Sequence, residues 1–179
     1  MKGLIFTEFI EMVEQEMGYE MVHHIITDSH LPSEGIYTAV GTYPETEMVQ
    51  LLTQLSKHTK TEIPELLFSF GKHLFSRFSV LYAHFFEGKT TAFELLENIE
   101  DYIHVEVLKL YPDAALPTID IIKQDDSNMQ LIYRSPRKLS QFALGLMTGC
   151  SEHYKEEIDI SEIKNIEDGS EVWFQLSKK

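Results

Sequence analysis

One histidine and three hydrogen-bond donors downstream of it have the types and spacing to hold a metal complex. His104 is followed thirteen residues later by Pro117, and then by Tyr133, Ser135 and Arg137. A neutral imidazole can bind a transition metal, and a phenol, a hydroxyl and a guanidinium can together hold an anion. A site that combines a metal ligand with an anion clamp suggests an iron porphyrin with its propionates.

Alternation in the predicted strand Asn128–Arg134 indicates how the three donors could meet. Side chains in a strand point to opposite faces in turn, and Pro136 favours extended geometry for the residue before it. If this period of two continues, Ser135 and Arg137 lie on the same side as Tyr133. A cluster at the sheet edge, with Arg137 bound to a local acid, explains the spacing equally well.

The elements that must position these residues begin with a run of predicted helices. Apolar residues recur at helical spacing through residues 1–112, with Gly18 and Gly88 as breaks. Thr90 or Thr91 can cap the last helix, and Glu94 completes a predicted capping box. The predicted helices are 4–17, 19–30, 45–59, 64–81 and 91–111, the last with Leu96, Ile99, Ile103, Val107 and Leu110 as its apolar line.

After Pro112 the pattern changes from helical to alternating. Two hairpins are expected, with a helix between them, and the second hairpin turns at Asn165–Gly169. The fold class is therefore α+β, with a helical N-terminal part (1–112) followed by a four-stranded antiparallel sheet with an intervening helix (113–179). We expect one domain over residues 1–179. The predicted strands and helix are Thr118–Lys123, Asn128–Arg134, Lys138–His153, Ile158–Lys164 and Glu171–Leu176.

Composition excludes several classes of partner. The formal charge of −14 would repel nucleic acid and anionic membrane surfaces. The start of the chain has no continuous apolar segment of the signal-peptide kind, so a cytoplasmic location is expected. Cys150 is the one cysteine, so neither an internal disulfide nor a multi-cysteine metal site can form.

The pattern of His104, Pro117, Tyr133, Ser135 and Arg137 resembles that of the H-NOX family, the haem-based nitric oxide and oxygen binding domains. The opening MKGLIF, the FGKHLF stretch and the order of helices before sheet are also similar to the family. The resemblance therefore covers the whole chain. Each motif alone is weak, whereas their combination is specific.

The resemblance implies a role for each matching residue. His104 would be the proximal ligand of a haem b enclosed between the helical part and the sheet, and Tyr133, Ser135 and Arg137 would bind its propionates. Pro117 would press on the porphyrin and distort it. The pocket and its distal side would be lined by Leu4, Ile5, Phe9, Leu74, Phe78, Phe142 and Leu146.

The resemblance also implies which gas is sensed. Oxygen-binding members carry a distal Tyr five residues after the motif Arg, and this chain has Phe142 there. Without that donor we expect a sensor selective for NO over O2 that also binds CO. NO would release His104 and let the haem relax, which would shift helix 91–111 relative to the N-terminal helices. A separate effector, a histidine kinase or a cyclic-di-nucleotide enzyme, would respond to that shift.

A haem enzyme of peroxidase or NO-consuming type is the alternative function, and a binding module without haem is the third. The enzyme would use His73 and Arg77, which are four residues apart on the predicted helix 64–81, a helix rich in Phe. Both lie beside the apolar stripe, so we expect them to face solvent and the protein not to be an enzyme. Cys150 is expected to be structural. The acidic runs Glu97-Glu100-Asp101 and Glu156-Glu157-Asp159 are expected to be solvated.

Overall fold

The computed structural model describes residues 1–166 and 169–179. Glu167 and Asp168, in the predicted turn Asn165–Gly169, lie outside the described residues. The chain divides into two compact units, Met1–Leu66 and Leu67–Lys179, and the division falls inside one helix. No helix in the described part of the chain is both long and apolar enough to cross a membrane.

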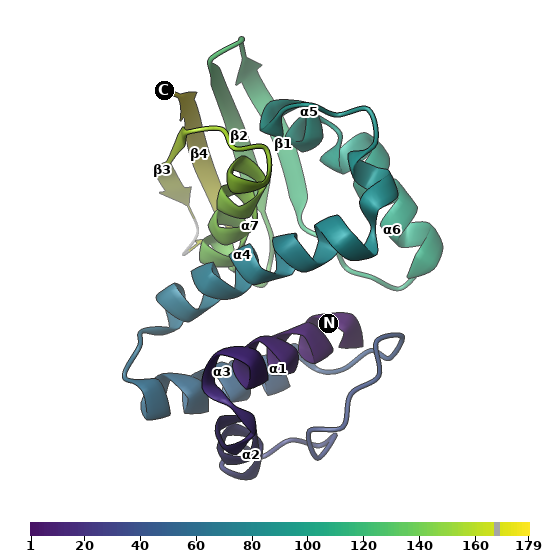
Figure 1. The fold of residues 1–179 in the computed structure, drawn as a ribbon, viewed down its shortest axis with the longest axis vertical. Coiled ribbons are helices and arrows are strands. Elements are labelled where there is room, and N and C mark those ends of the chain that lie inside the picture. The colour runs from purple at the N-terminus through teal and green to yellow at the C-terminus, as the bar shows by residue number, and fades with distance from the viewer. Residues whose placement is uncertain (167–168) are drawn as a thin grey trace. The chain divides into compact units, whose positions relative to one another are not determined.

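The first unit contains three complete helices, as the helical periodicity predicts, and the start of a fourth (Figure 1). Gly18, with φ of +85°, separates the first two, and its N–H donates to the carbonyl of Glu14 at 2.9 Å. Left-handed φ values favour glycine, which confirms Gly18 as the predicted break. The second helix ends at Thr27, three residues before its predicted end at His30. The helices are α1 (Gly3–Met17), α2 (Tyr19–Thr27) and α3 (Glu45–Thr59).

A buried carboxylate ties the long loop 28–44 to α3. Glu47 is 1% exposed, and its Oε2 accepts hydrogen bonds from the hydroxyls of Ser33 and Tyr37, the latter at 2.9 Å. Burial raises the pKa of Tyr37, so the phenol stays protonated and can donate. Its ring stacks on Phe6 at 4.4 Å between centroids. Glu47 and the stacked ring of Tyr37 thus attach the loop 28–44 to the helices of the first unit.

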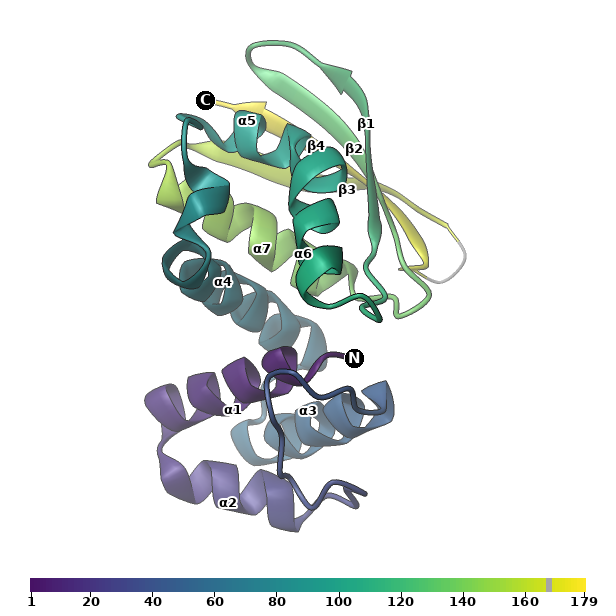
Figure 2. The same cartoon turned by 90° about the vertical axis from the view of Figure 1, so that its right-hand side faces the viewer.

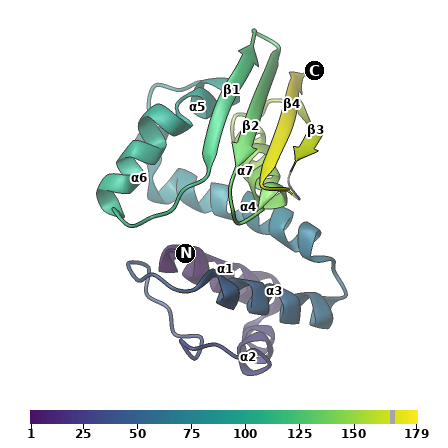
Figure 3. The same cartoon turned by 180° about the vertical axis from the view of Figure 1, so that it is seen from behind.

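The second unit carries a four-stranded antiparallel sheet, which confirms the predicted α+β class. Figure 3 shows the strand order β1-β2-β4-β3, with the later hairpin beside the earlier one. The predicted strands hold to within two residues, and the intervening helix starts at Ser140 instead of Lys138. The elements are α4 (Ile63–Leu81), a 3-10 turn (Ala83–Phe86), α5 (Ala92–Glu97), a π-helical turn (Ile99–Ile103), α6 (His104–Leu110), β1 (Thr118–Gln124), β2 (Asn128–Arg134), α7 (Ser140–His153), β3 (Ile158–Ile166) and β4 (Glu171–Lys178).

The core of this unit lies on one face of the sheet. The two central strands, β2 and β4, pair in a register that sets buried side chains directly opposite each other. Helices α5 and α7 cover this face, and α6 lies beside the β1 edge (Figures 1 and 2). Facing apolar side chains at this separation pack together and leave water. The buried pairs are Met129–Leu176, Leu131–Phe174 and Tyr133–Val172.

The predicted continuous helix 91–111 is wrong, because a π-helical turn divides it into α5 and α6. The N–H of Ile103 donates to the carbonyl of Asn98, five residues back, at 2.9 Å. His104 becomes the first residue of α6. A π-turn holds more residues than an α-turn and so rotates the residues after it about the helix axis. The predicted apolar line therefore fails at its end, where Leu110 is 56% exposed.

Helices α4 and α7 cross with their backbones in contact. A Cβ atom on Gly71 would lie 2.2 Å from the carbonyl oxygen of Phe142, and one on Gly145 would lie 2.1 Å from that of Phe68. Neither distance is sterically possible, so only glycine permits this approach. The crossing fixes the spacing of two helices that carry predicted pocket residues.

Substitution of Gly145 by Ala should destabilise the protein despite the higher helix propensity of alanine. The propensity gain is about 1 kcal/mol, whereas overpacking against a backbone carbonyl costs about 1–3 kcal/mol and the adjacent helices must move. Denaturant unfolding of the haem-free protein measures the change. Ser76→Ala, at an exposed position of α4, is the matched control and should stay within about 0.5 kcal/mol of wild type. A Gly145→Ala variant as stable as this control would contradict the close crossing.

Candidate functional site

His104 stands at the junction of the π-turn and α6, with one ring nitrogen occupied. Its Nδ1 lies 3.1 Å from Oε1 of Glu100, one turn earlier, and its side chain is 16% exposed. A carboxylate oxygen can only accept, so Nδ1 carries the proton and donates it to Glu100. The lone pair of the neutral ring then lies on Nε2, which is the atom a metal would bind.

The surroundings of His104 favour its neutral form. Burial lowers the pKa of the imidazole, and the nearby charge and hydrogen bond of Glu100 offset this only in part. A metal ligand must be deprotonated, so a lowered pKa keeps His104 available as a ligand at neutral pH.

Glu100 makes more contacts with the protein than the sequence predicts. The acidic run Glu97-Glu100-Asp101 was expected to be solvated, yet Oε1 of Glu100 also accepts the backbone N–H of Ile119 at 2.6 Å. One carboxylate oxygen thus joins the π-turn, His104 and the second residue of β1. The spacing of four residues between Glu100 and His104 was the signal available in the sequence.

The three predicted anion donors do gather at the end of β2. Tyr133 and Ser135 are buried, and hydrogen bonds to Tyr133 come from the Ser135 side chain and the Leu139 backbone. Burial raises the pKa of Tyr133, while these bonds and the charge of Arg137 pull it down. The phenol therefore remains a proton donor beside a hydroxyl and a guanidinium.

The predicted way in which Arg137 reaches this cluster is wrong, because the extended strand stops before it. The N–H of Ser135 still pairs with the carbonyl of Ser170 at 2.8 Å, but the N–H of Arg137 then donates to Ser135 Oγ at 3.2 Å and that of Lys138 to the Ser135 carbonyl. These bonds close a turn around Pro136. Proline provides no N–H and fixes φ, both of which suit a turn.

The segment between α6 and β1 connects His104 to the anion cluster, which consists of Tyr133, Ser135 and Arg137. Ile119, held by Glu100, pairs directly with Tyr133 across β1 and β2. Arg137 Nη1 donates to the carbonyl of Ala115 in the same segment at 2.6 Å. Pro117 is half-buried between these two attachments. The structure therefore brings together the residues of the sequence pattern, although they span 34 positions.

The predicted apolar pocket residues divide between the two compact units. Leu74, Phe78, Phe142 and Leu146 belong to the second unit, on α4 and α7 beside the glycine crossing. Leu74 is buried and the other three are half-buried, and the ring of Phe142 lies 5.1 Å from that of Phe70.

On α1 of the first unit, Phe9 is buried, and Leu4 and Ile5 are half-buried. Their contact with a haem stays a prediction.

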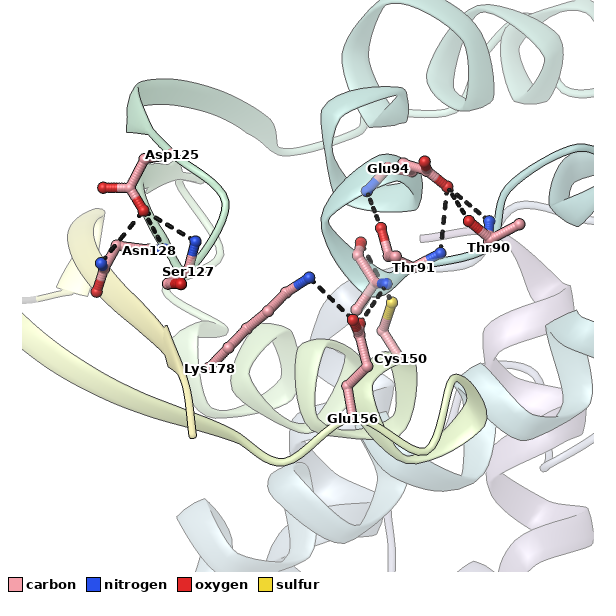
Figure 4. A network of polar contacts seen from close by, with 10 residues as sticks. Thr90, Thr91, Glu94, Asp125, Ser127, Asn128, Cys150, Glu156 and Lys178 are labelled. Atoms are coloured by element: carbon pink, nitrogen blue, oxygen red, sulfur yellow. Dashed lines mark hydrogen bonds and ion pairs between the residues drawn. The ribbon is translucent and has the colours of Figure 1, made fainter.

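The start of α5, from which the histidine segment continues, is fixed by the predicted capping box (Figure 4). Thr91 Oγ1 accepts the N–H of Glu94 at 3.2 Å, and the Glu94 carboxylate accepts that of Thr91 at 3.2 Å. Glu156 accepts the N–H of Ala92 at 2.7 Å and pairs with Lys178 at 2.9 Å. The expectation that Glu156 is solvated is therefore wrong, since it anchors α5 to the end of β4.

The residues of the alternative function are less exposed than expected. His73 and Arg77 are half-buried on α4, and Nε2 of His73 is buried, so the expected solvent-facing position of His73 is wrong. A half-buried imidazole beside an apolar helix stripe is accounted for by packing alone. Cys150 is fully buried with its thiol 3.8 Å from the Ala92 carbonyl, and burial raises the pKa of the thiol, which disfavours the reactive thiolate.

Comparison with known proteins gives a consistent result. The family model described as Haem-NO-binding matches residues 2–162. An H-NOX protein from K. algicida, solved in the unliganded Fe(II) state, is 45% identical and superposes with a TM-score of 0.91, covering 100% of this chain and 97% of that chain. A search of curated proteins gives no significant match.

Two further solved structures are similar over the whole chain. An H-NOX protein from S. oneidensis in the Fe(II)NO state is 26% identical with a TM-score of 0.92, covering 100% of this chain and 99% of that chain. The H-NOX from Shewanella woodyi in the Fe(II)CO state is 37% identical with a TM-score of 0.86, covering 100% and 95%.

Replacing Thr91 by Ala should cost about 1 kcal/mol of stability, because the first turn of α5 loses its side-chain cap. Thr91→Ser keeps the hydroxyl and is expected to retain most of that free energy. Urea unfolding followed by circular dichroism compares the two variants with wild type. Equal stabilities for the Ala and Ser variants would show that the capping bond contributes nothing.

Proposed function

Since the chain belongs to the H-NOX family of haem-based gas-sensor domains, we propose that it binds haem b through His104 and selects nitric oxide over O2. The observation that carries this proposal is the state of His104. Its Nδ1 donates to Glu100, burial lowers the pKa of its ring, and Nε2 is left as the ligand atom. Imidazole held in this way by a carboxylate is a common arrangement for a metal ligand.

The donor cluster at the end of β2 fits the other end of a haem. Tyr133 and Ser135 supply hydroxyl groups, and Arg137 supplies a guanidinium that can hold a carboxylate through two parallel N–H groups. We assign the propionates to these three residues. Since Ile119 joins this cluster to Glu100 and His104, the ligand and the clamp share one rigid support. Both parts of the donor set therefore suit the same cofactor.

Selectivity for NO is assigned to Phe142. A donor on the distal side favours O2, because O2 gains negative charge on ferrous haem, and a hydrogen bond to a charged group contributes about 1.5–3 kcal/mol. The Phe142 side chain offers no donor and packs beside Phe70. The relatives solved in the Fe(II)NO and Fe(II)CO states support NO and CO as ligands.

Signalling would proceed by release of His104. If NO weakened the attachment of His104 to the iron, α6, whose first residue is His104, would be freed, and the pressure of Pro117 on the haem would be relieved. A separate protein, of the histidine kinase or cyclic-di-nucleotide enzyme class, would respond to the moved helix. In this proposal the two compact units work as one haem-binding domain over residues 1–179.

Anaerobic absorption spectroscopy of the ferrous protein tests this function. We expect a Soret band after loading with hemin, spectral shifts with NO and with CO, and no stable O2 complex in air. His104→Ala should abolish ligation by the protein, and added imidazole should restore a histidine-like spectrum. A wild-type protein that takes up no hemin, or a His104→Ala variant with the wild-type spectrum, would overturn the assignment.

Phe142→Tyr should raise O2 affinity by about 10- to 150-fold, the equivalent of one charge-assisted hydrogen bond. The O2 dissociation constant of the ferrous protein is the quantity to measure. Phe86→Tyr adds the same hydroxyl to a ring that packs against Phe75 and His153, and should leave O2 affinity unchanged. No difference between the two variants would mean that residue 142 does not contact the bound gas.

A further inference from the structure

The carboxylate of Glu100 occupies a position that ordinary helix stabilisation does not explain. Its Oε1 accepts two hydrogen bonds, from Nδ1 of His104 at 3.1 Å and from the N–H of Ile119 at 2.6 Å. The first donor is on the ring expected to bind iron, and the second is in β1. The Glu100 side chain is 34% exposed, so these bonds form at the boundary of the protein, where water competes for them less than at an open surface.

We propose that Glu100 is a positioning residue that sets the strength of the bond between His104 and iron, and thereby the NO concentration at which His104 is released. This inference rests on the proposed function, because it requires haem ligated by His104. One side chain, that of Glu100, would then set the NO concentration at which the sensor responds, which His104 alone does not determine.

The electronic effect of Glu100 comes from its hydrogen bond to His104. A carboxylate that accepts the Nδ1 proton draws that proton away from the ring and raises the electron density on Nε2. A more basic Nε2 binds iron more strongly and stabilises the ferric state relative to the ferrous state. Glu100 should therefore hold the reduction potential down and resist loss of the histidine when NO binds.

The mechanical effect of Glu100 comes from its second hydrogen bond. Because Ile119 N–H holds the same oxygen, the carboxylate cannot follow the ring freely when His104 moves. Ile119 in turn pairs with Tyr133. The orientation of the His104 ring is therefore fixed relative to β2, which carries Tyr133. Release of His104 must break its bond to Glu100 or strain the attachment to β1, and either adds to the free energy that NO has to supply.

A purely structural role is the competing interpretation, in which Glu100 only caps the amide of Ile119. The two interpretations differ in what a neutral side chain of the same shape does. Glu100→Gln can still accept both hydrogen bonds through its carbonyl oxygen but lacks the charge that polarises the imidazole. Asp101→Asn removes the same charge from the adjacent, exposed residue of the π-turn and is the matched control.

The experiment compares hemin-loaded wild type, Glu100→Gln and Asp101→Asn by three readouts. These are the iron–histidine stretching frequency in the unliganded ferrous state, the reduction potential, and the NO concentration at which the iron–histidine signal disappears. We expect Glu100→Gln to lower the frequency, raise the potential and release His104 at about 10-fold less NO, since losing the partner of a metal-bound histidine typically weakens it 10- to 100-fold. Asp101→Asn should match wild type in the frequency and in the NO threshold.

The outcomes separate this proposal from the one on which it rests. If wild type takes up no hemin, the proposed function fails. If wild type binds haem and NO but Glu100→Gln and Asp101→Asn behave alike in all three readouts, the proposed function stands and the role of Glu100 is structural. Glu100→Leu, which loses both bonds, adds a haem-free readout: the Ile119 amide should exchange with solvent faster, whereas it should stay protected in Glu100→Gln.

Discussion

The apolar face shared by β2 and β4 is the constraint on which the second unit depends. Strict alternation puts Met129, Leu131 and Tyr133 on one side of β2, and antiparallel register sets each opposite an apolar residue of β4. Removing this surface from water supplies the driving force that holds α5 and α7 against the sheet. Tyr133, the last member of the row, has its ring in the core and its hydroxyl at the edge, which is how a packing residue also becomes a binding residue.

Two glutamates connect distant elements of the second unit in the same way. Glu100 and Glu156 each accept a backbone N–H from a distant element, Ile119 in β1 for the first and Ala92 in α5 for the second. A buried or half-buried N–H without a partner is costly, so a carboxylate that satisfies it contributes to stability and also fixes a separation. The acidic composition of the chain is therefore partly structural and does not only cover the surface with charge.

Much of this architecture is encoded in local patterns. The glycine at the end of α1, the capping box at Thr91, and the four strands follow from rules that act within a few residues, and these predictions are confirmed. The gathering of Tyr133, Ser135 and Arg137 also follows from sequence spacing, although the turn after Ser135 differs from the predicted extension. The resemblance to H-NOX proteins added the roles of these residues, which spacing alone left open.

The features that escaped prediction depend on contacts between distant parts of the chain. A π-turn has no signature at a period of 3.6, and the turn before His104 contains Glu100, which accepts the N–H of the distant Ile119 in β1. The strand order and the bonds of Glu156 are likewise decided across long separations in sequence. A charged residue is predicted to be solvated unless its partner is close in the sequence, so the bonds of Glu100 to Ile119 and of Glu156 to Ala92 escape prediction.

In the π-turn before His104, one carbonyl accepts two backbone hydrogen bonds. The carbonyl of Asn98 accepts the N–H of Tyr102, four residues on, at 3.2 Å and that of Ile103, five residues on, at 2.9 Å. One acceptor thus takes part in an α-type and a π-type bond at once, a three-centre arrangement. The capping box holds the start of α5 still. The segment that leads to His104 is therefore fixed at its start by side-chain hydrogen bonds and ends in a turn whose backbone bonding is part α-type and part π-type.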